Sequence, residues 1–534
     1  MIFKSKFPDI EIPQVGIYQY VTSNPKKIPD DKVTYVDGIT GRSYTFGEFI
    51  HETKKFAAGL QDKLGFKCGD VLTIFSPNQV DYPIVALGTI AAGGKVATAN
   101  LYFEAADLSL QLIDSGASVL IVHPDNLEVA IEASIKAKIP ASMILLFGDK
   151  EINGYKPYCS VLINDREIEP IYYTPEEAKS TTAYLIYTSG TTGKPKGIEI
   201  THTNLVAWLA QLTITECKLG SNSITTSVAQ FCHCYALIYI VHATLILGTT
   251  TIVLSNHSVE TICESIQKFK VNYVYTSPAT IIQLVNDPLA QQYDLSSVDM
   301  ILSAGFMLDN KWERKFYEMF KIPIYQCYGL SEACAVLLPD TTKNVVQGSA
   351  GILIPNMKAK ILSDDGCELG YNQPGGLWIQ GPNIFKGYIN NKEATIASFD
   401  KDGFFYTEDV ASVDEQGNYF IVDRRNEIIR CHEAYVSPSE LESILLTHEA
   451  VSDAAVVGYE KEAVEFPTAY VTIKNGYKQS QTLAEEIQSF VDEKVESYKK
   501  LSGGVFFIDR IPKNSMGKTQ RLLLRKKLNN EKMN

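Results

Sequence analysis

Long uncharged apolar segments are absent from this chain, although 45% of its 534 residues are hydrophobic. No window reaches the 18 or more apolar residues that a membrane-spanning helix needs. The N-terminus also lacks the apolar core of a secretory signal, and the last residues differ from an S-K-L type peroxisomal address. We therefore expect a cytoplasmic protein without a membrane span.

Paired cysteines and a surplus of basic residues are missing as well. The ten cysteines are scattered and form no C-x-x-C pair, so we expect thiols rather than disulfides. Cys232-His233-Cys234 has no second ligand pair nearby in the sequence, which disfavours a zinc site. A net charge of −13 disfavours a nucleic-acid partner, which would require a basic face. Nothing in the sequence indicates an obligate protein partner.

The hydrophobic residues alternate between strand-like and helix-like patterns over the first 350 residues. Residues 44–60 have a helical pattern. Short apolar runs predict strands at residues 71–75, 119–122, 143–147, 273–275 and 301–303. Because strands that alternate with helices form βαβ crossovers, we expect mainly parallel sheets. From about residue 350, turns and short strands such as 375–381 indicate a small β-subdomain.

The chain is too long for one ordinary hydrophobic core, which predicts at least two domains. Near residue 422 a strand pattern ends abruptly in the charged segment 423–426. The residues beyond it have helix and strand patterns of their own, enough for a small α+β domain. We therefore predict an α/β fold with a large N-terminal domain, residues 1–422, and a smaller C-terminal domain, residues 423–534.

Residues 187–197, Tyr-Thr-Ser-Gly-Thr-Thr-Gly-Lys-Pro-Lys-Gly, directly follow an apolar strand pattern. Glycines permit close approach of the backbone, and hydroxyl and ammonium groups donate hydrogen bonds to phosphate oxygens. Pro195 stands where a P-loop would need its second glycine, so this is a different phosphate loop. The predicted phosphate-binding residues are Thr188, Ser189, Gly190, Thr191, Thr192, Gly193 and Lys196.

Four further segments, 325–332, 406–409, 422–424 and 511–518, carry aromatic, hydroxyl, acidic and basic residues suited to nucleotide chemistry. Together with the phosphate loop, the residues of these segments and their order along the chain resemble the motifs of the adenylate-forming superfamily. That superfamily includes acyl- and aryl-CoA synthetases, beetle-type luciferases and peptide-synthetase adenylation domains. The resemblance spans nearly the whole chain and implies ATP and Mg²⁺ as cofactors, a mobile C-terminal lid, and activation of a carboxylic acid to an acyl-adenylate.

The resemblance also implies roles for individual residues in the nucleotide site. Tyr328 would stack on adenine, Ser331 would contact the AMP phosphate, and Glu332 would help to hold Mg²⁺. Gln326, in the same segment, is also assigned to the cofactor site. Asp409 and Arg424 would reach the ribose hydroxyls. Lys518 would bridge the substrate carboxylate and the α-phosphate, where a cation stabilises charge that develops in the transition state.

The acid pocket is predicted from the same resemblance. His233 matches a gate residue near the acyl group, and Gly305, Phe306 and Cys327 match the pocket wall. Phe306 and Met307 are bulkier than the residues that relatives have there, and Cys327 stands where relatives usually have glycine. We therefore expect a pocket with its own shape, whose acid the sequence does not identify.

The lid segment departs from the pattern of CoA-forming relatives. Arg430 and His432 would serve the second step, but Glu433 occupies the position of a glycine that lines the pantetheine channel. A negative charge there opposes an anionic cofactor by on the order of 1 kcal/mol or more. Glu408 also replaces a glycine. Two second steps therefore stay open: transfer of the acyl group to CoA, or, as in a luciferase-type monooxygenase, oxidation of a luciferin by O₂ with emission of light.

Overall fold

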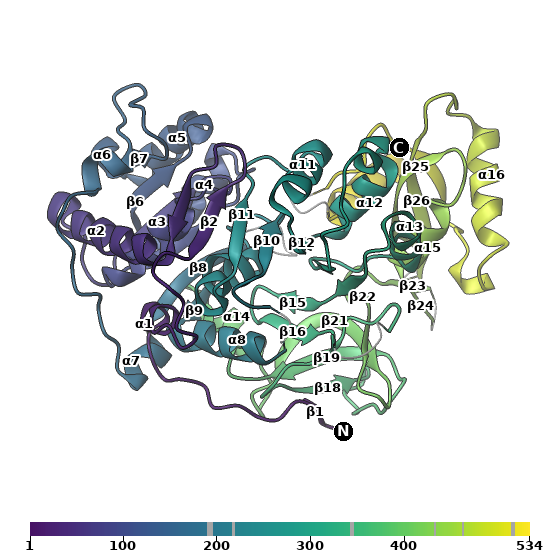
Figure 1. The fold of residues 1–534 in the computed structure, drawn as a ribbon. Coiled ribbons are helices and arrows are strands. Elements are labelled where there is room, and N and C mark those ends of the chain that lie inside the picture. Colours follow the sequence, from purple (N-terminus) through teal and green to yellow (C-terminus); the bar gives the residue numbers. More distant parts are fainter. Residues whose placement is uncertain are drawn as a thin grey trace. The chain divides into compact units, whose positions relative to one another are not determined.

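The computed structural model describes residues 1–188, 196–215, 219–341, 346–431, 434–461, 464–513 and 518–533 of the chain (Figure 1). The chain divides into two compact units. The larger unit comprises Ile2–Ala359 and Ile379–Phe405, and the smaller unit comprises Met1, Lys360–Trp378 and Tyr406–Asn534. In the described part of the chain, no helix is long and apolar enough to cross a membrane.

The first sheet of the larger unit has seven strands in the order β20-β9-β8-β5-β4-β6-β7. The strands are β20 (Gly387–Tyr388), β9 (Lys196–Thr201), β8 (Thr182–Thr188), β5 (Lys95–Thr98), β4 (Val71–Phe75), β6 (Ala117–Val122) and β7 (Ile144–Leu146). The pairs from β8 to β7 are parallel, whereas β8 with β9 and β9 with β20 are antiparallel. Every residue of β4 is buried, as expected for a central strand of a parallel sheet whose two faces are covered.

The second sheet of the larger unit also has seven strands, in the order β14-β13-β12-β10-β11-β2-β3. The strands are β14 (Ile324–Gln326), β13 (Met300–Ser303), β12 (Tyr273–Thr276), β10 (Ile224–Ser227), β11 (Thr250–Val253), β2 (Val33–Asp37) and β3 (Ser43–Thr45). All pairs from β14 to β2 are parallel, and the β2–β3 pair is antiparallel. The predicted parallel sheets are therefore confirmed.

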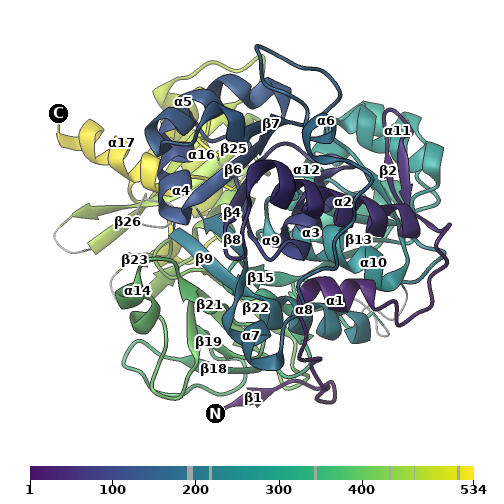
Figure 2. The ribbon, with the colours of Figure 1, turned by 90° about the vertical axis from the view of Figure 1, so that its left-hand side faces the viewer.

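Helices of the larger unit pack against these sheets and against one another. The longest is α2 (Phe46–Leu64), which begins at a capping box between Thr45 and Glu48 and ends at Gly65 with φ +63°. It packs against α3 (Tyr82–Ala91) and α6 (Tyr158–Leu162), and α4 (Ala105–Ser115) packs against α5 (Leu127–Ala137) (Figure 2). Beside the second sheet lie α11 (Val259–Phe269), α12 (Pro278–Asn286) and α13 (Asn310–Phe320). The other helices are α1 (Ile17–Thr22), α7 (Pro175–Ser180), α8 (His202–Thr215), α9 (Cys234–Ala236), a π-helical turn (Leu237–His242), α10 (Ala243–Leu247) and α14 (Lys392–Ala397).

A small antiparallel sheet of the larger unit follows the end of β14. It consists of β15 (Tyr328–Leu330), β16 (Cys334–Leu338) and β17 (Ile352–Leu353), in that order. A two-residue strand near the N-terminus, β1 (Phe3–Lys4), pairs with the first two residues of β18 (Lys358–Leu362). In the second sheet, the carboxyl ends of β12, β13 and β14 lead into loops and into the β15–β16 hairpin. Open α/β sheets commonly bind ligands at the carboxyl ends of their strands.

The smaller unit contains two parts. One is most of a β-sheet, and the other is an α+β assembly nearer the C-terminus. The sheet has the order β18 (Lys358–Leu362), β19 (Gly375–Gln380), β21 (Phe405–Val413) and β22 (Tyr419–Arg424). The assembly consists of a hairpin, β23 (Ile429–Cys431) with β24 (Ala434–Val436), and a sheet of β25 (Val451–Lys461), β26 (Val464–Ile473) and β27 (Gly504–Phe507). Its helices are α15 (Pro438–Leu445), α16 (Gln481–Asp492) and α17 (Arg521–Met533), around a core that includes Leu441, Val456 and Ile487. The domain boundary at residue 423 stays a prediction.

Candidate functional site

The two ends of the predicted phosphate loop lie on neighbouring strands of the first sheet. Thr188 is the last residue of β8 and Lys196 is the first residue of β9, and the two are partners in the antiparallel register. The sheet therefore fixes both ends of the loop side by side. Ser189, Gly190, Thr191, Thr192 and Gly193 lie outside the described residues, so their phosphate contacts stay a prediction.

The segment with the predicted adenine, phosphate and metal residues forms one edge of a hairpin. Tyr328 begins β15, and Ser331 and Glu332 form the turn into β16. Gly329 lies so close to β16 that a Cβ atom on it would be 1.5 Å from the carbonyl oxygen of Cys334, so only glycine fits. The side chains of Tyr328, Ser331 and Glu332 are half-buried. An aromatic ring, a hydroxyl and a carboxylate are thus presented from a single turn.

Tyr388, which the sequence reasoning missed, joins Glu332 to Lys196. Its hydroxyl donates a hydrogen bond of 2.9 Å to Glu332 Oε1. Lys196 Nζ lies 5.1 Å from the centroid of its ring, within the range of a cation–π interaction. The dipeptide Gly387-Tyr388 matched no motif in the sequence reasoning, so the sequence did not single out Tyr388. The structure thus connects the predicted phosphate lysine to the predicted metal carboxylate through one side chain.

The surroundings of Glu332 fit a hard divalent cation. Mg²⁺ prefers oxygen ligands and is commonly held by one or two carboxylates together with substrate phosphates. The Glu332 carboxylate is oriented by the Tyr388 hydroxyl, and the Glu332 carbonyl accepts a hydrogen bond of 2.8 Å from the backbone of Phe385. Such outer contacts are typical of groups that ligate metals.

Gln326 lies at the end of β14, where its amide organises the neighbouring loop. Gln326 Oε1 accepts a bond of 2.7 Å from the Leu308 amide, and Nε2 donates a bond of 3.0 Å to the Leu308 carbonyl. Nε2 also lies 3.4 Å from Glu313 Oε2. The side chain is buried and therefore fixes the loop between β13 and α13. A contact between Gln326 and a cofactor stays a prediction.

The predicted wall residues of the acid pocket meet beside the end of β13. Both the amide and the thiol of Cys327 donate to the carbonyl of Ser303, at 3.0 and 3.6 Å. Gly305 follows with φ +107°, a left-handed conformation that favours glycine and turns the chain after the strand. Phe306 and Met307 are half-buried in this loop. The two bonds to Ser303 therefore join Cys327 to the start of this loop.

His233 lies on the segment that precedes α9. Burial lowers the pKa of its imidazole to about 4, so the ring is neutral near pH 7. Its Nε2 atom is buried and makes no hydrogen bond among the described residues. The thiol of Cys334 donates to the carbonyl of Cys234 at 3.5 Å. This contact ties the His233 segment to the hairpin of β15 and β16.

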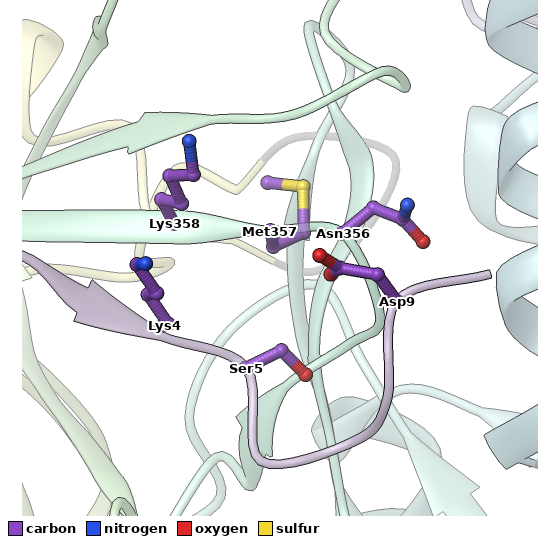
Figure 3. Close-up of a pocket in the computed structure, with 6 residues that line it drawn as sticks. All are labelled: Lys4, Ser5, Asp9, Asn356, Met357 and Lys358. Atoms are coloured by element: carbon purple, nitrogen blue, oxygen red, sulfur yellow. The ribbon is translucent and has the colours of Figure 1, made fainter.

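A separate hollow of about 310 Å³ in the larger unit contains none of the predicted site residues (Figure 3). It is lined by Lys4, Ser5, Asp9, Asn356, Met357 and Lys358. The carboxamide of Asn356 bonds to both the amide and the carbonyl of Ile10, which holds the N-terminal segment in place. The hollow is therefore a feature of how the N-terminus packs, distinct from the candidate site.

In the smaller unit, the two predicted ribose residues form an ion pair. Asp409 on β21 and Arg424 on β22 are register partners, and Arg424 Nε lies 3.4 Å from Asp409 Oδ1. Thr407 supports this turn, because its hydroxyl accepts a bond of 3.1 Å from the Asp409 amide and donates one of 2.9 Å to the Leu377 carbonyl. Two residues that are 15 positions apart in the sequence are thus brought together by one antiparallel pair.

Lys518 of the smaller unit belongs to a network of partly buried charges. Its Nζ lies 3.4 Å from Glu427 Oε1, and the other oxygen of Glu427 lies 2.6 Å from Arg521. Arg521 is 7% exposed and also bonds to Glu442 at 2.8 Å. Burial raises the pKa of Glu442, and Arg521 opposes this shift. Glu427 and Arg521 hold one another firmly, whereas the contact to Lys518 is longer and nearer to solvent.

Arg430, one of the two predicted second-step residues, lies on β23 of a short hairpin. Arg430 is exposed, and its backbone amide donates a bond of 2.7 Å to Glu465 Oε2. His432 and Glu433 lie outside the described residues. Sequence reasoning singled out Arg430 but found neither Glu427 nor Arg521, because isolated charged residues in one sequence show no partner.

Known proteins match this chain over nearly its whole length. The AMP-binding enzyme model matches residues 21–389, and the AMP-binding enzyme C-terminal domain model matches residues 440–518. The chain is 34% identical over 541 residues to a 4-coumarate–CoA ligase of Pinus taeda, covering 99% of this chain and 98% of the relative. It is 36% identical over 550 residues to a probable 4-coumarate–CoA ligase of Dictyostelium discoideum, covering 98% and 97%. A solved anthranilate CoA ligase in complex with anthranoyl-AMP shares the fold, with a TM-score of 0.87 at 22% identity and coverage of 98% and 99%.

The chain therefore belongs to the AMP-binding enzyme family and, within it, to the 4-coumarate–CoA ligase-like enzymes. The predicted superfamily and the predicted α/β fold with a C-terminal AMP-binding domain are confirmed.

Proposed function

We propose that this protein activates an aromatic carboxylic acid with ATP and transfers the acyl group to CoA. In the first step a carboxylate oxygen attacks the α-phosphorus, and acyl-adenylate and pyrophosphate form. In the second step the CoA thiol displaces AMP. The observation that carries the proposal is the connection of Lys196, at the end of the phosphate loop, to Glu332 through Tyr388.

Each residue predicted for the nucleotide site offers a group suited to its role. Tyr328 supplies a ring for adenine, Ser331 a hydroxyl for the α-phosphate, and Thr188 with Lys196 the flanks of the phosphate loop. The paired Asp409 and Arg424 offer an acceptor and a donor for the ribose hydroxyls. Mg²⁺, when bound at Glu332, would offset the charge of the departing pyrophosphate.

The residues of the smaller unit would act by gating. We place the hinge at Asp423, whose Oδ2 accepts bonds of 3.0 and 2.9 Å from the hydroxyls of Ser437 and Ser439. These bonds link the hinge to the start of α15, so residues from 423 onward would turn together. One orientation would present Lys518 for adenylation, and another would present Arg430 and His432 for thioester formation.

The side chains predicted to line the acid pocket favour an aromatic acid over a long saturated one. Phe306, Met307 and Cys327 offer apolar and polarisable contacts, and the neutral His233 imidazole can form a hydrogen bond without adding charge. The relatives named above act on coumarate and anthranilate, which are both aryl acids. We therefore infer a benzoate-like or phenylpropenoid acid as the substrate class.

Product analysis tests this proposal directly. Purified enzyme would be incubated with ATP, Mg²⁺ and a panel of aryl and fatty acids, with and without CoA, in air. We expect an aryl-CoA, AMP and pyrophosphate in equal amounts, detected by mass spectrometry, and no light. Accumulation of acyl-adenylate that CoA does not consume, or O₂ consumption with light, would contradict the ligase assignment.

A further inference from the structure

We propose that Tyr388 is a positioning residue for adenylation: it orients the Glu332 carboxylate and holds the Lys196 ammonium close by, without neutralising either charge. The inference rests on the proposed function, because it assigns Glu332 to the metal and Lys196 to the phosphates. It adds a residue from outside the predicted motifs, on the edge strand β20.

Tyr388 is fixed from its backbone outward. Its strand pairs with β9, where Tyr388 is opposite Ile198 and Gly387 is opposite Glu199. The Tyr388 amide donates a bond of 2.9 Å to the hydroxyl of Thr395. The ring of Phe385 packs edge-on against the Tyr388 ring, with centroids 4.9 Å apart. The strand pairing and the Thr395 bond therefore fix the backbone of Tyr388, and Phe385 packs against its ring.

The hydroxyl acts on Glu332 as a neutral donor. It donates to Oε1, which restricts rotation of the carboxylate. A cationic donor in this position would compete with the metal for the same negative charge, whereas a phenol does not. Hydrogen-bonded neighbours of this kind commonly change metal affinity by one to two orders of magnitude.

The face of the ring acts on Lys196. Because the attraction between an ammonium group and a ring is electrostatic but transfers no countercharge, Lys196 keeps its full positive charge for a phosphate. A neighbouring lysine shows the alternative. Lys386, one residue before Gly387, lies 3.3 Å from the carboxylate of Glu199 and forms a direct ion pair. Strand β9 and the start of β20 thus have one lysine beside a carboxylate, Lys386, and one beside an aromatic face, Lys196.

Two substitutions separate the two contacts. Tyr388→Phe removes the hydroxyl and keeps the ring, and Tyr388→Leu removes both. Tyr172→Phe, at a tyrosine that is 72% exposed, is the matched control. Each protein would be titrated with Mn²⁺ in the presence of a non-hydrolysable ATP analogue, with free Mn²⁺ followed by electron paramagnetic resonance. Mg²⁺ and ATP dependence would be measured in parallel by acid-dependent ATP–pyrophosphate exchange, and folding by thermal denaturation.

We expect Tyr388→Phe to weaken Mn²⁺ binding about 3- to 10-fold and to raise the half-saturating Mg²⁺ concentration similarly, with an unchanged KM for ATP at saturating metal. Tyr388→Leu should in addition raise the KM for ATP about 2- to 5-fold. Superimposable metal titrations for wild type and Tyr388→Phe would overturn the proposal, as would a loss of kcat alone. If wild type shows no exchange with any acid, the proposed function fails, and the Mn²⁺ titration still decides the role of Tyr388.

Discussion

At the scale of single residues, Lys518 is the side chain on which the proposed chemistry depends most. Lys518→Ala should lower the kcat of ATP–pyrophosphate exchange by about 10²- to 10³-fold with little change in the KM for ATP, because the ammonium group acts on charge that develops in the transition state. Lys513→Ala is the matched control, since Lys513 lies nearby in the chain and pairs with Asp453 at 2.6 Å. An unchanged kcat in Lys518→Ala would remove Lys518 from the first step.

Also at this scale, two buried histidines, His202 and His242, and the half-buried His233 predict how stability depends on pH. Burial lowers the pKa of His202, His233 and His242 to about 4. The ordinary value is about 6.5, so between pH 6.5 and 4 the unfolded chain binds protons that the folded chain does not. The contribution of these histidines to the free energy of unfolding should therefore be greatest above pH 6.5 and should decrease as the pH drops toward 4.

Urea denaturation from pH 4.5 to 7 would measure this loss. His242→Gln should reduce the slope by up to about 1.4 kcal/mol per pH unit, because one proton fewer is taken up on unfolding. His51→Gln, at an exposed histidine, is the control. Identical slopes for wild type and His242→Gln would show that this imidazole does not contribute.

At the scale of secondary-structure elements, strand β21, which carries Asp409, contains local strain at Glu408. Glu408 has φ +61°, a left-handed conformation that costs an ordinary residue about 1 kcal/mol. The sequence indicated that Glu408 replaces a glycine, and the structure shows that the backbone keeps a conformation suited to glycine. The strand pair with Arg424 on the other side holds it there.

Glu408→Gly should therefore stabilise the protein by up to about 1 kcal/mol, less the greater entropy that glycine gives the unfolded chain. Glu415→Gly is a suitable control, because Glu415 lies in the next turn, is exposed and is not among the positive-φ residues. It should be neutral or slightly destabilising. A lower denaturation midpoint for Glu408→Gly than for wild type would show that the Glu408 side chain makes compensating contacts.

At the scale of the whole molecule, the proposed second step would depend on the predicted lid. The resemblance places Glu433 at the position of a glycine, and a carboxylate there would oppose an anionic cofactor. Glu433→Gly should raise kcat/KM for CoA about 5-fold, which corresponds to about 1 kcal/mol, and leave ATP–pyrophosphate exchange unchanged. Stopped-flow or quench measurements of acyl-adenylate consumption would separate the two steps. Equal CoA dependence in both proteins would show that CoA avoids this residue.

Local sequence patterns were sufficient for much of the fold. The strand predicted at residues 71–75 is β4, and the helix predicted from residue 44 begins at the capping box of Thr45 and Glu48. These predictions are confirmed because apolar periodicity and capping act over a few residues. The adenylate-forming family could likewise be recognised from the sequence, because the residue types of its motifs and their order along the chain are distinctive.

The contacts that position the site residues were beyond reach of the sequence. Tyr388 bonds to Glu332 across 56 positions, and Arg521 bonds to Glu427 across 94. Strand order and register decide which polar groups meet over such distances, and here the pairing of β20 with β9 is decisive. No local sequence pattern indicates that pairing.

The sequence by itself determined the class of enzyme, the two-part α/β architecture, and the chemical type of each candidate group, because residue identity fixes charge, hydroxyl content and backbone freedom. The tertiary structure decided how those groups are held. It placed Lys196 on an aromatic face rather than on a carboxylate, left His233 neutral through burial, and bound Lys518 to a carboxylate that Arg521 anchors. Charge state, orientation and partner are properties of the surroundings, and only the packed chain creates those surroundings.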